Sequence, residues 1–419
     1  MTHGRSRHRA WFAASLLLAA AAAAGPTQAA GEREYQAQFL VQLHAGEDAA
    51  TARIRIMQPR QRLKRLRLQM PEPAFSSVRG DGRVSREGDV VTWEVPARGG
   101  ELRYETIITH RRNDKGYDAL VTGRWAMFRL DDVFPPAVAV HTKNARGRGE
   151  VLFDLPPGWT SVSPYPPDAD GRMPFVNPKR RYARPVGWAL AGHIGARMDV
   201  IGPTTVRIAA PRDQGAPRVP MLALIRTTLP VLQEELSRVP PYLLILTAGD
   251  PMWRGGLSAP NSFFIHAGRP LISENGTSTL VHELLHVLAP VLTQRDHDWI
   301  DEGLAEYLGL VVLQRGQLIS PQRFDHAIAT FRHRGAGVSS MVTPAASGPV
   351  TARAVAIFHD LDQELQRRGP AGSDIFELLR RMMQETEPLD IKRLRALAAD
   401  IVGGKPVNAL AASRVPGEA

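Results

Sequence analysis

Short stretches in which apolar and polar residues partly alternate occupy the first half of the chain, after about residue 30. A period of two places successive side chains on opposite faces of a strand, and turns rich in Gly, Pro and charged residues separate the stretches. The predicted strands cover residues 35–44, 51–57, 63–70, 90–95, 101–110, 151–155, 189–194 and 205–208. This pattern predicts an N-terminal β domain over residues 31–210, built as a β-sandwich or a saddle-shaped sheet with long loops.

The second half of the chain has patterns typical of helices. Ser320-Pro321 provides an N-cap residue followed by Pro at the first helical position, and two apolar runs, 242–248 and 262–266, predict buried strands. The predicted helices cover residues 220–238, 278–289, 299–313, 320–332, 351–367 and 374–384. We therefore predict a multidomain α+β protein in which a mainly helical domain, residues 211–419, follows the β domain.

The first 30 residues have the organisation of a secretory signal peptide. Arg5, Arg7 and Arg9 precede an apolar stretch at 11–24, and a Gly-Pro pair and small residues follow it. Fourteen apolar residues are too few to cross a bilayer comfortably. We expect residues 1–30 to be removed and the mature protein to be exported, to a periplasmic or extracellular location, with no stable membrane span. A retained N-terminal anchor is the alternative.

Composition narrows the chemistry that the chain can perform. Among 419 residues there is no cysteine, which excludes disulfides, thiolate metal sites and a cysteine nucleophile. The formal net charge is +10, but the sequence has no run of five or more like charges. In the densest basic stretch, residues 60–67, basic residues alternate with Leu, as on a strand with one solvated face. We therefore expect no nucleic-acid partner, and any metal must be held by His, Asp or Glu.

The candidate chemistry is concentrated in the HELLH segment at residues 282–286, a HExxH motif. On a helix, His282 and His286 lie one turn apart on the same face, where both imidazoles can bind one metal ion. Glu283 lies next to them and can deprotonate a metal-bound water. Thr277 or Ser278 can cap the helix, whose apolar residues form a stripe opposite the histidines.

A second predicted helix follows with two carboxylates on one face. Residues 299–307, WIDEGLAEY, contain Glu302 and Glu306. Zinc hydrolases with two histidines need a third protein ligand and keep one position open, and Glu302 can be that ligand. Glu306, one turn further on, can accept a hydrogen bond from the far nitrogen of a metal-binding histidine. Two histidines and one carboxylate suit a single Zn²⁺ ion best.

At these residues the sequence resembles the gluzincin metallopeptidases, in particular the glycyl aminopeptidase and aminopeptidase N families. The resemblance is strongest in the HExxH…WxxEGxAEY core at 282–307. Weaker similarity lies at residues 155–159, at Gly255, Gly256 and Leu257 with Asn261 and Ser262, and at residues 352–362. The resemblance implies a β N-terminal domain, a thermolysin-like catalytic domain, a peptide or protein substrate, and a substrate-binding strand at Gly255, Gly256 and Leu257. It also assigns the third ligand to Glu302, although the 19 residues between His286 and Glu306 match a spacing that thermolysin-like enzymes use.

The sequence departs from these families where they recognise the substrate. Ser258 stands where they place a glutamate that binds the free amine of the substrate, with Glu274 and Asp250 as nearby acids that could replace it. Thr351 stands near the position of their tyrosine, because no tyrosine follows Tyr307. The spacing of 15 residues from His286 to Glu302 is shorter than is typical of aminopeptidase N. We also expect no C-terminal PDZ module of the kind common among glycyl aminopeptidases.

Two functions remain open at this point. The first is an exported zinc metallopeptidase that cleaves peptide bonds with zinc-activated water and Glu283 as general base. The second is a catalytically inactive relative that binds zinc or peptide, which the loss of the amine-binding glutamate and the tyrosine favours. A group that stabilises the oxyanion is not identified by the sequence. Arg353 is the candidate nearest to the expected tyrosine position, and His326, His333 and His359 are others.

Overall fold

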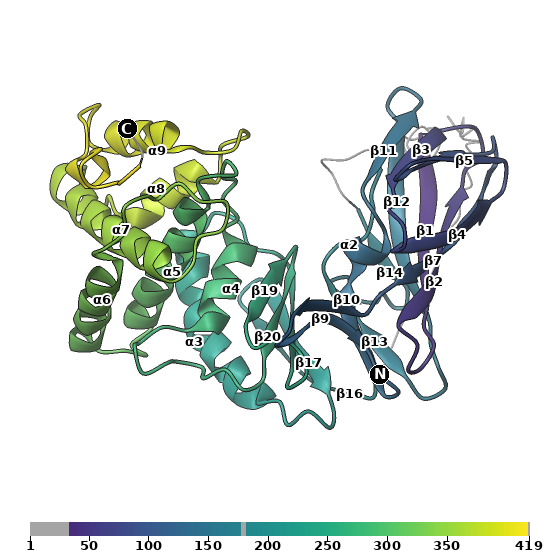
Figure 1. Cartoon of the computed structure of the whole chain (residues 1–419), viewed down its shortest axis with the longest axis horizontal. Helices are drawn as coiled ribbons and strands as arrows, with labels where there is room; N and C mark the ends of the chain where they lie inside the picture. Colours follow the sequence, from purple (N-terminus) through teal and green to yellow (C-terminus); the bar gives the residue numbers. More distant parts are fainter. Residues whose placement is uncertain (1–32, 177–181, 418–419) are drawn as a thin grey trace, which may run out of the picture.

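The chain folds into a β half and a helical half that lie side by side (Figure 1). The computed structural model describes residues 33–176 and 182–417, so the expected signal peptide at residues 1–30 lies outside the described residues. Strands β1 to β15 form one half, coloured purple to teal, and helices α3 to α9 dominate the other, coloured teal to yellow. Within the described ranges, no helix is long and apolar enough to cross a membrane.

Two sheets form the sandwich of the first half, and their inner faces share one hydrophobic core that includes Phe39, Leu66 and Trp93. One sheet has the order β14-β12-β1-β2-β7-β4, with bounds Met173–Phe175, Arg146–Asp154, Glu34–Gln42, Ala49–Met57, Gly99–Ile107 and Phe75–Gly80. The other has the order β11-β3-β6-β5, with bounds Ala137–His141, Leu63–Gln69, Val90–Glu94 and Arg83–Glu87. In β3 the leucines are buried while Lys64 and Arg67 are exposed, as expected for a strand with one solvated face.

A third sheet joins the two halves. Its order is β13-β15-β10-β9-β8, with bounds Thr160–Val162, Trp188–Gly192, Trp125–Arg129, Gly116–Val121 and His110–Asn113. Trp125, Met127 and Trp188 from this sheet pack with Leu244 and Phe264 of the sheet in the second half. The interface is therefore a hydrophobic core rather than a polar linker.

The second half contains a mixed sheet in the order β16-β17-β18-β20-β19, with bounds Ile194–Ile201, Thr204–Pro211, Tyr242–Ala248, Ser262–His266 and Gly256–Ala259. All residues of β18 and β20 are buried, because helices cover one face of this sheet and the third sheet covers the other. Since β17 pairs in parallel with β18, this sheet begins at β16, earlier in the chain than the expected division at residue 210. Strand β19 is at the edge of the sheet.

Helices complete the second half, with bounds α3 Arg218–Glu235, α4 Thr279–Leu288, α5 Asp298–Arg315, α6 Pro321–Gly335, α7 Pro349–Arg368, α8 Ile375–Met382 and α9 Ile391–Ile401. The short helix α2, Leu130–Val133, lies in the β half. Of the seven helices just listed, all within the described residues, six occur where the sequence pattern predicts them. Helix α9 was not predicted, although Asp390 caps it by accepting from the backbone N–H of Arg393 and Leu394 and Leu397 are buried at helical spacing.

Candidate active site

Helix α4 presents two histidines on the side opposite its buried face. The hydroxyl of Ser278 accepts a hydrogen bond from the backbone N–H of Val281, which caps the helix where the sequence predicted a cap. Leu284, Leu285 and their apolar neighbours pack into the core. The Nε2 atoms of His282 and His286 consequently face each other at 3.0 Å.

Glu302 of α5 meets both histidines. Its carboxylate oxygens lie 3.4 Å from Nε2 of His282 and 3.6 Å from Nε2 of His286. Among the described residues, these three side chains form the only group of at least three His, Asp or Glu residues with ligand atoms all within 4.8 Å of one another. A tetrahedral Zn²⁺ with bonds of about 2.0–2.2 Å holds its ligand atoms about 3.3–3.5 Å apart. The separations of 3.0–3.6 Å, in which each histidine faces a different oxygen of Glu302, are of the size that one zinc ion held by these three side chains requires.

Two further carboxylates lie beside the outer nitrogens of the imidazoles. Glu306 lies 3.0 Å from Nδ1 of His282, and Asp301 lies 3.1 Å from Nδ1 of His286. Such partners fix the tautomer of a metal-binding histidine, because Nδ1 carries the proton while Nε2 is free to bind. Glu306 thus lies beside His282, and the orienting role expected for it from the sequence stays a prediction; Asp301 was not predicted. Its position directly before Glu302 was the available signal.

The charges around the two imidazoles favour a cation. Burial lowers the pKa of His282, but the carboxylates of Glu302 and Glu306 outweigh it and raise the pKa well above its ordinary value. For His286, Asp301 outweighs burial in the same way and raises the pKa. Carboxylates thus surround both imidazoles, and a metal ion bound by Nε2 would supply the positive charge that these carboxylates stabilise.

Glu283 lies beneath the edge strand of the sheet. Its side chain is 7% exposed, and burial raises its pKa although the neighbouring histidines and the backbone N–H of Ser258 act in the opposite direction. A Cβ atom at Gly256 would lie 2.4 Å from Cγ of Glu283, so only glycine lets β19 pass this close. The glycines at 255 and 256 therefore do two things: Gly256 makes room for Glu283, and Gly255 makes room for the ring of Trp253.

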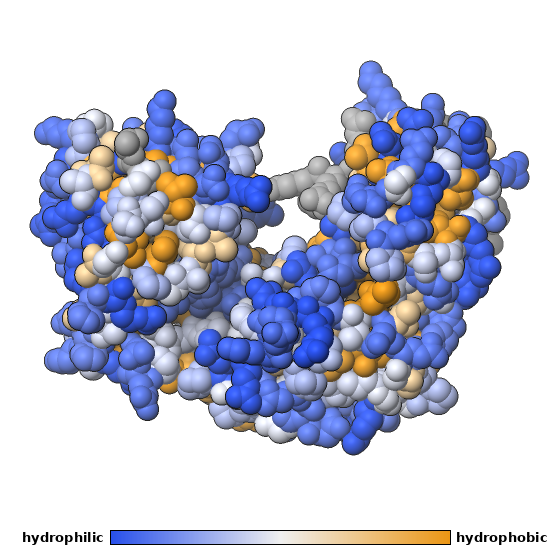
Figure 2. All heavy atoms as spheres, in the orientation of Figure 1, coloured by the Kyte–Doolittle hydropathy of each residue, from blue (hydrophilic) through white to orange (hydrophobic). Residues whose placement is uncertain are grey.

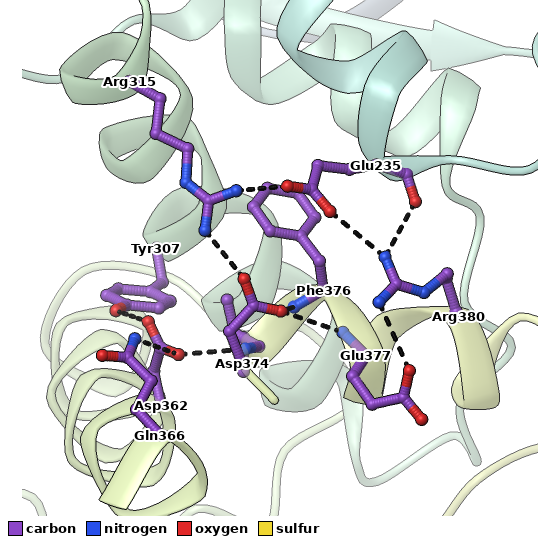
Figure 3. A network of polar contacts seen from close by, with 10 residues as sticks. Glu235, Tyr307, Arg315, Asp362, Gln366, Asp374, Phe376, Glu377 and Arg380 are labelled. Atoms are coloured by element: carbon purple, nitrogen blue, oxygen red, sulfur yellow. Dashed lines mark hydrogen bonds and ion pairs between the residues drawn. The ribbon is translucent and has the colours of Figure 1, made fainter. Parts of the chain in front are cut away.

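A polar network anchors the helix that carries the carboxylates (Figure 3). The hydroxyl of Tyr307, next to Glu306, donates to Oδ2 of Asp362 on α7 at 2.6 Å, and Oδ1 of Asp362 accepts from the backbone N–H of Ile375 at 2.9 Å. Arg315, at the end of α5, pairs with Glu235 of α3 and with Asp374, the N-cap of α8. Helix α5 is therefore fixed to three other helices, which restricts the position of Glu302.

The cluster opens into a cleft of about 750 Å³. Gly255, Gly256, Leu257, Ser258 and Thr351 line the cleft together with the histidines and Glu283. Its walls also include residues that sequence reasoning did not select: Arg112, Trp253, Arg269, Asn275, Asp298, Thr330, Phe331 and Arg334. Residues from both halves of the chain therefore surround His282, His286 and Glu302.

Arg353, the candidate oxyanion-stabilising residue, lies outside the cleft. Its guanidinium donates to the backbone carbonyl of Arg414 at 2.8 Å, and Arg353 is not part of the cleft wall. The side chain of Thr351, two residues earlier on α7, belongs to the wall instead. Residues two positions apart on a helix point in different directions, so Arg353 cannot share that orientation. The other candidate donors, His326, His333 and His359, are also missing from the wall formed by the described residues.

The acids considered as substitutes for an amine-binding glutamate do not reach the cleft. Asp250 pairs with Arg254 and lines a separate cavity with His266, and Glu274 is an exposed loop residue. The five carboxylates that line the metal cleft are Glu283, Asp298, Asp301, Glu302 and Glu306. Four of them belong to the metal cluster and its surroundings, and Asp298 accepts from the backbone N–H of Ala346 at 2.7 Å.

Comparison with known proteins finds similarity in structure but not in sequence. No model of a protein family and no curated protein matches the sequence. Solved structures do match the fold, among them an aminopeptidase N family protein from Idiomarina loihiensis, a mutant M1 zinc metallopeptidase from Deinococcus radiodurans and native yeast LTA4 hydrolase.

These likenesses extend over nearly the whole chain. The Idiomarina protein has a TM-score of 0.64 at 12% identity, over 89% of this chain and 77% of its own. The Deinococcus protein has a TM-score of 0.59 at 15% identity, over 92% of this chain and 94% of its own. The yeast protein has a TM-score of 0.57 at 13% identity, over 92% of this chain and 68% of its own. The expected gluzincin-like fold is therefore confirmed: a β-rich N-terminal part precedes a helical part.

Proposed function

We propose that the protein is an exported zinc-dependent metallopeptidase that hydrolyses peptide bonds. The observation that carries this proposal is the combination of a complete set of metal ligands, His282, His286 and Glu302, with the buried carboxylate of Glu283 in one cleft. A site that served structure alone would need ligands but no general base beside them. The likeness to zinc metallopeptidases supports the same function, and the signal-like N-terminus supports export.

Each residue of the site has a separate task in this proposal. A zinc ion held by the three ligands would lower the pKa of water and polarise the carbonyl of the scissile bond. Glu283 accepts the proton from the attacking water and delivers it to the leaving amine. Burial raises the pKa of Glu283, and a raised pKa makes its carboxylate a stronger base for the first of these steps. Glu306 and Asp301 keep both imidazoles oriented throughout.

Metal removal tests this function. We expect the purified full-length protein to hydrolyse unstructured peptides, to lose this activity after dialysis against a chelator, and to recover it with one equivalent of Zn²⁺. Activity would be followed with an internally quenched peptide, and metal content by atomic spectroscopy. A protein that binds one zinc ion and cleaves none of a broad set of peptides would instead be the catalytically inactive relative.

Among the described residues, the cleft wall offers no unengaged carboxylate that could bind the substrate's amine as an aminopeptidase does. A desolvated ammonium needs a carboxylate partner, but Ser258 offers only a neutral hydroxyl and the carboxylates of the cleft wall lie around the metal ligands or accept from Ala346. The open edge of β19 can instead bind an extended peptide through its backbone. We therefore propose that longer peptides are cleaved internally.

Blocking the substrate's amine tests this specificity. We expect an N-terminally acetylated peptide and its free-amine twin to be cleaved with kcat/KM values within about threefold of each other, because no charge-assisted bond, worth about tenfold to a hundredfold, is lost. Single aminoacyl amides should be poor substrates. A strong preference for the free amine would contradict internal cleavage and indicate an aminopeptidase.

A further inference from the structure

Among the described residues, the arginines of the cleft wall form no ion pair with its carboxylates. Three arginines line it, and each comes from a different element: Arg112 from β8, Arg269 from the loop after β20, and Arg334 from the end of α6. Figure 2 shows hydrophilic side chains gathered where the two halves meet, over β9 and β20. The carboxylates of the cleft, in contrast, are occupied by the histidines or by backbone N–H groups.

Arg334 is directed to the cleft by the periodicity of its helix. Ala327, Thr330, Phe331 and Arg334 all line the cleft, and their spacing of three and four residues defines one face of α6. Arg332, on another face, pairs with Asp360 and is not part of the wall. Within residues 33–176 and 182–417, neither Arg334 nor Arg269 has an ion pair with a carboxylate, so both guanidiniums remain available to a ligand.

Arg112 brings the β half into the cleft. Its guanidinium lies over the ring of Trp253, 4.5 Å from the centroid, which leaves its N–H edges free apart from a distant contact of 3.9 Å with Asp118. Two backbone hydrogen bonds hold this contact in place: Tyr117 donates to Pro251 at 3.1 Å, and Trp253 donates to Tyr117 at 2.8 Å. The position of Arg112 beside the start of β19 is therefore built into the fold.

We propose that Arg112, Arg269 and Arg334 form a recognition site for carboxylate groups, so that the cleft selects acidic peptides. This inference rests on the proposed peptidase function and specifies its substrate. A peptide lying along β19 would place its neighbouring side chains or its C-terminal carboxylate against these guanidiniums, which can bind carboxylates in bidentate geometry.

The main experiment compares two blocked peptides with the zinc-loaded, full-length enzyme. Both are N-acetylated and C-amidated, and they differ only in carrying Glu or Gln at the positions around the scissile bond. We expect kcat/KM to be about tenfold or more higher for the Glu peptide at low salt, and the ratio to fall as added salt screens the charges. A third peptide, neutral and with a free C-terminal carboxylate, shows whether a terminal carboxylate is recognised as well as a side chain.

Variants assign the preference to the arginines. Arg334→Gln and Arg269→Gln should each lower the Glu-to-Gln ratio by about three- to tenfold through a loss on the Glu peptide. Arg334→Lys, which keeps the charge but cannot bind in bidentate geometry, should retain only part of the ratio. Arg367→Gln is the matched control, because Arg367 is an exposed residue of α7 outside the cleft wall. Equal cleavage of the two peptides by the unmodified enzyme, or equal losses on both peptides in the arginine variants, would overturn the proposal.

A binding measurement separates this inference from the proposed function. In the zinc-loaded Glu283→Gln variant, fluorescence anisotropy with labelled peptides should show tighter binding of the Glu peptide, and Arg334→Gln should abolish most of the difference. Failure to hydrolyse any peptide, together with this difference in binding, would contradict the peptidase function and support the carboxylate site. Equal or undetectable binding of both peptides would contradict the carboxylate site.

Discussion

Replacing Glu283 by glutamine is expected to lower peptide hydrolysis by about 10³-fold, within the range of roughly 10²–10⁴-fold for the loss of a general base. Glutamine has nearly the same shape as glutamate, so it fits under β19, where Gly256 leaves room for this side chain. It cannot accept the proton of the attacking water. The zinc content should stay at one ion per chain, because the three ligands are untouched.

Glu274→Gln serves as the control for this experiment, because Glu274 is an exposed carboxylate of a loop and lies outside the cleft wall. We expect it to retain full activity and full zinc content. Measuring kcat and metal content on the same samples separates a missing base from a missing metal. Equal activity of Glu283→Gln and the unmodified protein would eliminate Glu283 as the base and with it the proposed mechanism.

Local patterns in the sequence were sufficient to locate the centre of the site. The placement of His282 and His286 on one face depends only on the pitch of a helix, and the cap at Ser278 depends on adjacent residues. The position of Glu302 required a second helix to pack against the first, and the family-like pattern around it supplied that information. That the side chain of Arg353 lies outside the cleft could not be predicted, because its orientation depends on the rotation of α7 and on the hydrogen bond to the carbonyl of Arg414.

Some strands can be predicted from their own residues, whereas others depend on contacts with distant parts of the chain. Strands with buried leucines, such as β3 and β18, are predicted by their own residues. Strand β8 is exposed at all four positions, so its sequence carries no alternation of apolar and polar residues, although it supplies Arg112 to the cleft. Strands β16 and β17 resemble those before them in pattern, and only the parallel pairing of β17 with β18 assigns them to the second half.

The assignment of Glu302 and Glu306 leads to the second large effect. Glu302 faces Nε2 of both histidines, whereas Glu306 contacts Nδ1 on the outer side of the His282 ring, so only Glu302 can share an ion with the two Nε2 atoms. Loss of an outer partner typically lowers metal affinity about 10–100-fold. We therefore expect Glu306→Ala to bind zinc with an affinity reduced within this range. We expect the zinc affinity of Glu302→Ala to fall considerably further.

Competition with a chromophoric chelator would measure both zinc affinities without relying on activity. Glu302→Gln and Glu306→Gln are useful companions, because an amide retains the volume of each side chain while removing its charge. Circular dichroism of the metal-free proteins would establish that each variant is folded, which matters because α5 is held by the network around Tyr307 and Asp362. If Glu302→Ala kept full zinc affinity while Glu306→Ala lost it, the ion would have to bind one turn further along α5. The 19-residue spacing from His286 would then define the third ligand, and Nδ1 rather than Nε2 of His282 would have to face the metal.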